Sequence, residues 1–131
     1  MLIALHACDI ATDIAIAKGI QSDASIIIVA PCCHKQIRKE MNCSTSMQSI
    51  LRHGILLERQ AELVTDGIRA LLLEANGYST KVFEFISTEH TPKNVMIVAT
   101  RGKINEDALG KIKSIKKEFG IGEHYLERLL K

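Results

Sequence analysis

The sequence predicts an α/β fold in a single domain, and three observations predict it. Apolar runs rich in β-branched residues, at residues 2–7 and 24–30, have the length of buried strands. A long stretch, residues 55–76, repeats its apolar residues at helical spacing. Segments with strand and helix patterns alternate along the first two thirds of the chain, which is typical of a parallel sheet covered by helices.

The first elements are a strand, a helix and a second strand. The short apolar run "LIALHA" at residues 2–7 predicts a buried strand. Asp9 is expected to cap a helix over residues 11–20. The second strand covers residues 24–30 and stops at Pro31, which cannot donate a backbone hydrogen bond.

A helical region follows. One helix is expected over residues 34–42, "CSTSMQ" at 43–48 breaks it, and a further helical segment runs to about His53. The longest helix covers residues 55–76, and Gly77 is expected to end it in a left-handed conformation. Its apolar face consists of residues spaced by three and four: Leu57, Ala61, Val64, Ile68, Leu71 and Ala75.

Two more strands and a basic tail complete the chain. Residues 80–87 alternate in polarity and residues 95–100 are apolar, so both are predicted strands. The short loop between them, residues 89–94, predicts an antiparallel hairpin. Helical crossovers make the first three strands parallel, and the fourth turns back at or near one edge. The lysine-rich, amphipathic residues 105–131 are interpreted as helices with a solvated face.

Composition limits the class of protein. The chain has 131 residues, 47% of them hydrophobic, and a net charge of +2 that by itself demands no nucleic-acid partner. No run of eighteen apolar residues is present, so no membrane span is predicted. The N-terminus lacks the features of a signal peptide. The adjacent Cys32 and Cys33 are poorly placed to bond to each other, so we expect reduced thiols in a cytoplasmic protein.

Polar residues gather where the predicted parallel strands end, on one edge of the sheet. Open α/β sheets bind ligands at this edge, which makes it the expected site. The residues concerned are His6, Cys8, Asp9, Thr12 and Asp13 after the first strand, Pro31, Cys32, Cys33, His34 and Lys35 after the second, and Thr88, Glu89, His90, Thr91, Lys93 and Asn94 after the third.

Each of these residues also has a structural interpretation. His6 suits a core position at a strand end, and Asp9 and Asp13 are typical helix-capping residues. Glu89 and Asn94 suit a hairpin loop. Because so many polar residues follow the ends of three neighbouring strands, we expect a ligand site rather than unrelated structural positions.

Zinc binding at the same edge is an alternative. It would draw on His6, Cys8, Cys32, Cys33, His34 and His90. No C-x-x-C pair is present, however, and adjacent cysteines are crowded for the usual chelating spacing, so no residue is assigned to a metal. A nucleophilic cysteine–histidine pair is a further alternative, but no known sequence signature surrounds the cysteines.

Four segments resemble the C-terminal half of class I S-adenosylmethionine-dependent methyltransferases. They are "ALHACDIATDIAIAKGI", "IVAPCCHKQIR", "RHGILLERQAELVTDGIRALLLEANGY" and "KVFEFISTEHTPKNVMIVA". The resemblance is to a family with an L-H-A-C-[DG]-x-A-T-D element followed by a P-C-C-H element, and more distantly to tRNA 2′-O-methyltransferases. It covers residues 2–100 or more.

The resemblance implies a Rossmann-like sheet with helices on both faces. In that fold seven strands follow the order 3-2-1-4-5-7-6, and the seventh is antiparallel. Residues 2–7, 24–30, 80–87 and 95–100 then correspond to strands four, five, six and seven, in the order 4-5-7-6.

The resemblance also implies roles for single residues. Leu5, His6, Ala7 and Cys8 would face the cofactor, and Asp9, His6 and His34 would lie near the reacting acceptor as catalytic residues. The acceptor would be bound by Thr12, Asp13, Pro31, Cys32, Cys33, Glu89, His90, Lys93 and Asn94.

The chain also departs from the family pattern. It has neither the first three strands nor the glycine-rich loop that supplies most cofactor contacts. We therefore expect residues 1–131 to be a partial methyltransferase domain, a fragment that alone binds S-adenosylmethionine weakly or not at all and does not catalyse transfer. RNA is the favoured acceptor. The open strand at residues 2–7 predicts a homo-oligomer. The alternatives are a non-catalytic α/β module that assembles with itself or with the missing half, and a small metal-binding protein.

Overall fold

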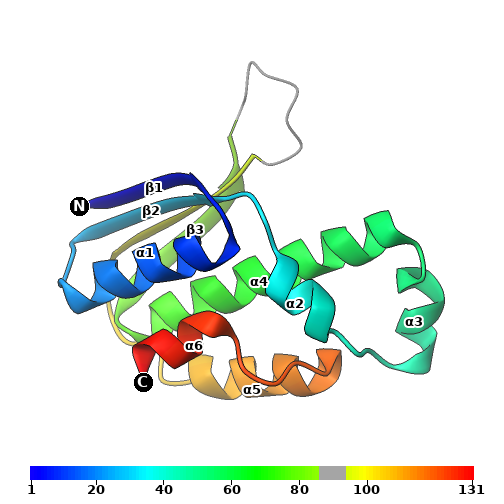
Figure 1. The fold of residues 1–131 in the computed structure, drawn as a ribbon. Coiled ribbons are helices and arrows are strands. Elements are labelled where there is room, and N and C mark those ends of the chain that lie inside the picture. Colours follow the sequence, from blue (N-terminus) through cyan, green and yellow to red (C-terminus); the bar gives the residue numbers. More distant parts are fainter. Residues whose placement is uncertain (86–93) are drawn as a thin grey trace.

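The protein is an α/β structure with one mixed sheet (Figure 1). The computed structural model describes residues 1–85 and 94–131. Its four-stranded sheet has the order β1-β2-β4-β3. The strands are β1 (Leu2–Ala7), β2 (Ile26–Pro31), β3 (Tyr78–Glu84) and β4 (Val95–Arg101).

The topology of the sheet agrees with the prediction. β1 and β2 are parallel, and β4 is antiparallel to both of its neighbours, β2 and β3. The first three strands therefore run the same way, and the last strand is reversed. The predicted α/β class is confirmed, and the observed order, first-second-fourth-third, is the one that the methyltransferase resemblance implies.

Six helices accompany the described strands. They are α1 (Asp9–Gln21), α2 (Lys35–Glu40), α3 (Thr45–Leu51), α4 (Gly54–Ala75), α5 (Ala108–Phe119) and α6 (Tyr125–Leu130). Gly77 follows α4 with φ of 88°, as predicted for a glycine that ends a helix. The predicted cap of the first helix was wrong. α1 already includes Asp9, whose carboxylate instead accepts a hydrogen bond from the amide of Gln36 in α2.

The core lies between the sheet and the helices. Ile27 and Val29 of β2 and Ile97 of β4 are completely buried on the face that meets α1 and α4. Burial of one face explains why these strands combine β-branched residues with a fixed register, because a slip of one residue would expose the whole set.

The opposite face of the sheet is apolar but carries no helix within residues 1–85 and 94–131 (Figure 1). The register aligns Ile3 with Ile28, and Ile28 with Val98, on that face. Ile3 is 52% exposed and its same-face neighbour Leu5 is 56% exposed. The helices expected on both faces are therefore found on one face in the described part of the chain.

Three helices, α1, α2 and α4, lie close to the edge of the sheet at which β1, β2 and β3 end. α1 starts there directly after β1, and α2 and the first turns of α4 lie beside it (Figure 1). Tyr78 secures the opposite end of the sheet, where its hydroxyl donates to the carbonyl of Ala24 over 2.8 Å. Among the described helices, none combines the length and the apolar character needed to cross a membrane.

Candidate functional site

Two groups of side chains lie at this edge of the sheet. The first, called here the arginine network, consists of Asp9, Asp13, His34, Asp66 and Arg69. The second, called the thiol group, consists of Cys8, Cys32 and Cys33. Both are formed by residues that come directly after β1 and β2, and α4 completes the arginine network.

Arg69 is the centre of the arginine network and is completely buried. Its Nε donates to Oδ1 of Asp13 over 2.7 Å, and its Nη1 donates to Oδ1 of Asp66 over 3.0 Å. Its Nη2 donates to the backbone carbonyl of Asp9 over 2.8 Å and lies 3.4 Å from Oδ1 of the same residue. One guanidinium therefore joins the start of α1 to the middle of α4.

The electrostatics of the network follow from burial. Burial raises the pKa of Asp13, and the Arg69 guanidinium opposes this effect. Burial also disfavours the charge of Arg69, but the carboxylates of Asp13 and Asp66 outweigh it, so the pKa of Arg69 is raised. A buried guanidinium is tolerated only when it is paired and hydrogen-bonded, and here each nitrogen of the fork has an acceptor.

His34 belongs to the same network through Asp66. Its Nε2 lies 3.1 Å from Oδ2 of Asp66, while the other oxygen of that carboxylate binds Arg69. Since an ionised carboxylate only accepts hydrogen bonds, the ring donates from Nε2 and, when neutral, keeps its lone pair on Nδ1. Nδ1 of His34 is buried without a hydrogen-bond partner in the described residues. A carboxylate that orients a histidine in this way leaves the second nitrogen free to accept a proton.

His124 lies next to this network and is completely buried. Its Nδ1 accepts a hydrogen bond from the amide of Leu126 over 3.1 Å. The side chain of Glu127 accepts one from the amide of His124, and the two bonds form a capping box at the start of α6. Burial lowers the pKa of His124 to about 3, and the neighbouring charges of Arg69, Lys116 and His34 add to this effect. His124 is therefore neutral at physiological pH.

The end of β1 has an irregular backbone. His6 has φ of 55°, which is uncommon for a residue other than glycine, and the register with β2 breaks between Leu5 and Ala7. As a result the carbonyls of His6 and Ala7 lie 3.6 and 3.4 Å from Sγ of Cys32. Backbone strain of this kind is found at functional sites more often than elsewhere.

The sulfur atoms of the thiol group lie within 4.8 Å of one another. Sγ of Cys32 is 3.7 Å from Sγ of Cys33. Burial raises the pKa of Cys32 to about 11, and the neighbouring thiols of Cys33 and Cys8 contribute. All four cysteines are free thiols, in agreement with the prediction.

Three residues expected to bind the acceptor are buried. Thr12 donates its hydroxyl to the carbonyl of Ala7 over 2.9 Å, Asp13 binds Arg69, and Pro31 ends β2. These three residues are buried beneath the edge of the sheet and do not line its surface. Five other predicted residues lie in the segment 86–93, outside the described residues: Thr88, Glu89, His90, Thr91 and Lys93.

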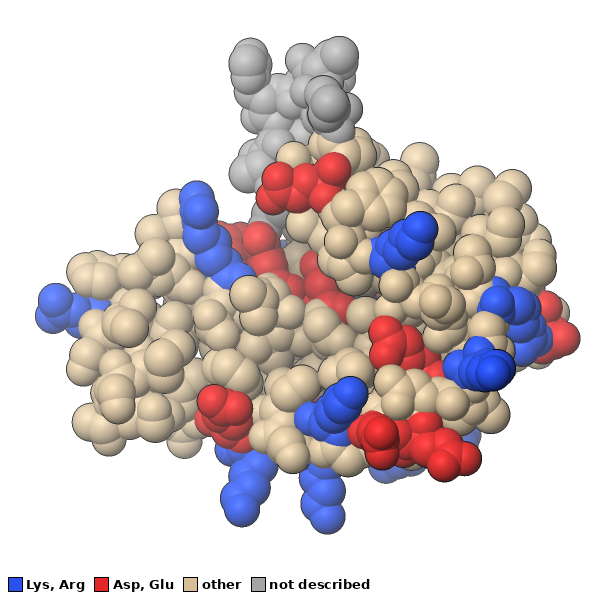
Figure 2. Space-filling model, turned by 180° about the vertical axis from the view of Figure 1, so that it is seen from behind, with Lys and Arg blue, Asp and Glu red and all other residues tan. Residues whose placement is uncertain are grey.

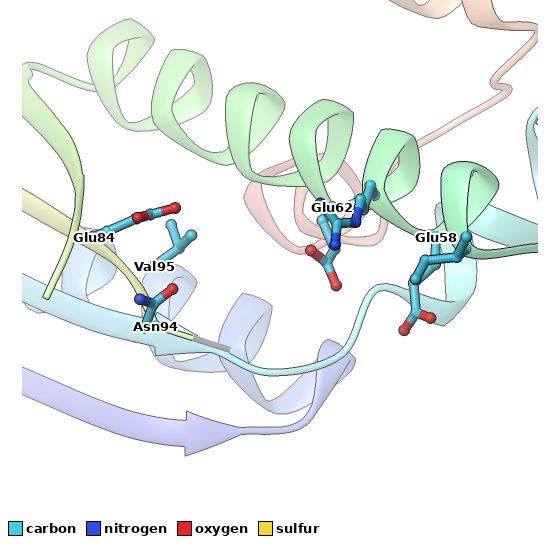
Figure 3. A pocket seen from close by; sticks show the side chains of 7 residues that line it. Glu58, Glu62, Glu84, Asn94 and Val95 are labelled. Atoms are coloured by element: carbon cyan, nitrogen blue, oxygen red, sulfur yellow. The ribbon is translucent and has the colours of Figure 1, made fainter. Parts of the chain in front are cut away.

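Asn94 lies in a different pocket from the thiol group. This pocket, of about 300 Å³, opens between α4 and the ends of β3 and β4. Figure 3 shows Glu58 and Glu62 on α4, across from Glu84 and Asn94 of the hairpin. Three glutamates and one arginine, Arg59, line this pocket, so its net charge is negative.

A groove between α1 and α2 adjoins the thiol group. Its volume is about 630 Å³, within the range typical of ligand sites. Cys8 and Asp9 line one side, and Lys35 and Lys39 line the other. Asp9 presents little free surface here, because Oδ2 binds the amide of Gln36 and Oδ1 faces Arg69.

The first part of the chain is similar to a known protein family. Residues 1–40 match a family model described as a methyltransferase domain. This segment resembles a methyltransferase domain. The match spans β1, α1, β2 and α2, and thus includes the His-Ala-Cys-Asp segment at 6–9 and the Pro-Cys-Cys-His segment at 31–34. No curated protein and no solved structure shows a significant match to the chain.

Asp66, Arg69 and His124 were not among the site residues predicted from the sequence. Asp66 and Arg69 lie in the longest helix, where the regular spacing of apolar residues predicts other positions as the buried ones. The available signal was a pair of opposite charges three residues apart within the otherwise apolar stretch at 64–73. His124 had no comparable signal, because its burial depends on long-range packing against the arginine network.

We predict that Arg69→Met lowers the free energy of unfolding by about 3–5 kcal/mol, because it leaves buried carboxylates without their cation. Urea denaturation measures the change. The matched control is Arg59→Met, an exposed arginine of the same helix, for which a change within about 0.5 kcal/mol is expected. A loss below about 1 kcal/mol in Arg69→Met would show that the network is not a main source of stability.

We also predict that His124 makes the fold sensitive to acid. Its pKa is about 3 when folded and about 6.5 when unfolded, so the unfolded chain takes up the proton first. The stability contributed by neutral His124 is complete above about pH 6.5 and decreases as the pH falls, by about 1.4 kcal/mol per unit.

The variant His124→Asn keeps an acceptor for the Leu126 amide but cannot take up this proton. Between about pH 7.5 and pH 5 the wild type should therefore lose about 2 kcal/mol more than the variant in urea denaturation. Equal losses in the two proteins would mean that His124 does not titrate as its burial indicates.

Proposed function

We propose that this chain forms the C-terminal half of the catalytic domain of an S-adenosylmethionine-dependent methyltransferase. The observation that carries the proposal is the position of two motifs. The His-Ala-Cys-Asp and Pro-Cys-Cys-His segments follow neighbouring parallel strands, inside the stretch that matches a methyltransferase domain. The sheet order, with its single reversed strand, supports the assignment of β1, β2, β3 and β4 as strands four, five, six and seven.

The cofactor is proposed to lie along the end of β1. Leu5, His6 and Cys8 are exposed there, with Ala7 between them, and the left-handed His6 turns the backbone out of the sheet. Leu5 offers apolar surface of the kind that an adenine ring requires. S-adenosylmethionine supplies the methyl group on a sulfonium. Residues 5–8 provide one side of such a site, so we propose that the 131-residue chain alone binds the cofactor weakly.

His34 is the proposed general base. Alignment of donor and acceptor supplies most of the catalysis in methyl transfer, and a base is needed when the acceptor is a hydroxyl. Of the three residues nominated from the sequence, Asp9 has both carboxylate oxygens engaged, and the His6 side chain has no orienting partner among the described residues. His34 is oriented by Asp66 and is 7% exposed, so proton transfer to Nδ1 requires its covering side chains to shift when the acceptor binds.

RNA is the proposed acceptor, on the basis of the motif resemblance to tRNA 2′-O-methyltransferases. Lys35 and Lys39 beside the groove are positioned to contact phosphates there. The acidic pocket with Glu58, Glu62 and Glu84 would repel phosphate, so the RNA is proposed to approach from the β1–α2 side. On the face seen in Figure 2, basic residues are interspersed with acidic ones rather than gathered into a single basic surface.

We predict that the protein encoded by the complete reading frame transfers methyl groups from labelled S-adenosylmethionine to RNA, whereas residues 1–131 alone do not. His34→Gln in that protein should lower kcat by about 100-fold to 10,000-fold and change KM little, since a base acts in the transition state.

His53→Gln is the matched control, because His53 is exposed and makes no side-chain cap to α4. Its kcat should equal that of the wild type. If the complete protein methylates no RNA, the acceptor assignment fails, and if it also fails to bind S-adenosylmethionine, the methyltransferase assignment fails.

A second proposal, from a different class, concerns assembly. β1 is an edge strand, since the sheet order places it next to β2 alone. Its exposed Ile3 and Leu5 continue the apolar face that the described helices leave open. Unprotected apolar edges pair with other chains. We therefore propose that the 131-residue chain associates with itself through β1 and the adjoining face.

We predict that the chain at tens of micromolar is a dimer or larger by light scattering, and that the double variant Ile3→Lys, Leu5→Lys is a monomer, because added charges repel at an edge. The control is Leu109→Lys, which places one lysine at a similarly exposed leucine of α5 and should leave the assembly intact. A monomeric wild type would contradict the proposal.

A further inference from the structure

The close approach of the three thiols is not explained by the proposed methyl transfer, in which only Cys8 has a place, beside the cofactor. Cys8 precedes α1 as its N-cap residue, and Cys32 and Cys33 lie between β2 and α2. Although Cys32 and Cys33 are adjacent in sequence, their sulfur atoms point toward the same region and are 3.7 Å apart. The sulfur of Cys8 lies within 4.8 Å of both.

The surroundings of these sulfur atoms are rich in electrons. The carbonyl oxygens of Ala7 and His6 lie 3.4 and 3.6 Å from Sγ of Cys32, because the irregular end of β1 turns them toward it. Three sulfur atoms and two carbonyl oxygens around one region attract a cation and repel an anion. Thiolates select soft or borderline metal ions, of which Zn²⁺ is the usual one in proteins.

The distances agree with coordination of a single ion. Zinc–sulfur bonds of about 2.3 Å in tetrahedral geometry place ligand sulfur atoms about 3.8 Å apart. The pair Cys32–Cys33 already has this separation, and the pairs with Cys8 need to shorten by no more than about 1 Å. Crowding of adjacent cysteines, the objection raised by the sequence, is therefore removed by the way the chain turns after Pro31.

We propose that Cys8, Cys32 and Cys33 bind one Zn²⁺ ion as thiolates. The three thiols release their protons to water on binding, and the resulting site carries one excess negative charge. Lys35 and Lys39 lie across the groove that Cys8 lines and offset that charge. His6 is not among the residues whose donor atoms lie within this cluster. Within the described residues no fourth histidine, cysteine or carboxylate joins the cluster, so the fourth position is proposed to take water or a donor atom of a ligand, as in zinc sites with three protein ligands.

The proposal is independent of methyl transfer, because it uses only the thiols of this chain. Its test starts from the reduced, chelator-treated 131-residue protein. Zn²⁺ is titrated against a chromophoric chelator, and the bound metal is counted by mass spectrometry. We expect one Zn²⁺ per chain with a Kd in the nanomolar range or below. Co²⁺ in place of Zn²⁺ should produce thiolate-to-metal charge-transfer absorption and the visible bands of a tetrahedral ion.

Single variants assign the ligands. Cys8→Ser, Cys32→Ser and Cys33→Ser should each weaken Zn²⁺ binding by about 100-fold or more, since each removes one of three thiolates. Cys43→Ser is the matched control, because Cys43 lines a separate pocket beside Leu57 and should leave affinity unchanged. Circular dichroism of every variant verifies that it is folded, and Cys8, which is exposed, is the variant expected to disturb the fold least.

Three results would overturn the proposal. The first is a Kd weaker than micromolar, or less than half an equivalent of metal, in the folded wild type. The second is equal affinity in the wild type and in the triple variant lacking Cys8, Cys32 and Cys33. The third is a disulfide between two of these cysteines that persists in millimolar glutathione, which would show that the close sulfur atoms serve a redox pair.

Discussion

A single buried cation organises the edge of the sheet at which β1 and β2 end. Arg69 has no contact with solvent, yet it reaches Asp13, which is separated from it by 56 positions in the sequence, through a hydrogen bond of 2.7 Å. The same guanidinium fixes Asp66, and the second oxygen of Asp66 fixes His34. The orientation of the proposed base therefore depends on a charge that never meets the substrate. Charges held in this way are preorganised, and need no reordering when a ligand arrives.

Patterns that follow from burial were predictable from the sequence. Ile27 of β2 and Ile97 of β4 are completely buried on the face of the sheet that α1 and α4 cover, and the period of α4 follows from packing one face on that sheet. The observed ends of the strands differ from the predicted ones where contacts distant in sequence extend a strand. β3 begins at Tyr78 rather than residue 80, because Tyr78 is buried and bonded to the turn before β2. The helix layer on the second face was implied by resemblance alone, and the described residues place none there.

The composition of the site was less predictable, because it depends on which residues meet across the fold. Spacing identified the segments 6–9 and 31–34, since polar residues after a strand stand out against the apolar run. It did not reveal that Asp13 binds an arginine of α4, or that Cys8 approaches Cys32 and Cys33. Motif rules such as C-x-x-C describe ligands supplied by one turn. Here the sulfur atoms come from two strand ends, and only the parallel pairing of β1 and β2 brings them together.

The bond from the Gln36 amide to Asp9 has a consequence for motion. The backbone amides in the first turn of a helix have no acceptor within that helix. In α2 the amide of Gln36 donates instead to Oδ2 of Asp9, in the first turn of α1, over 2.8 Å. The two helices are thereby fastened at the ends nearest the groove. The Gln36 amide hydrogen would exchange with solvent only when α1 and α2 separate, so its exchange rate reports on each opening of the groove.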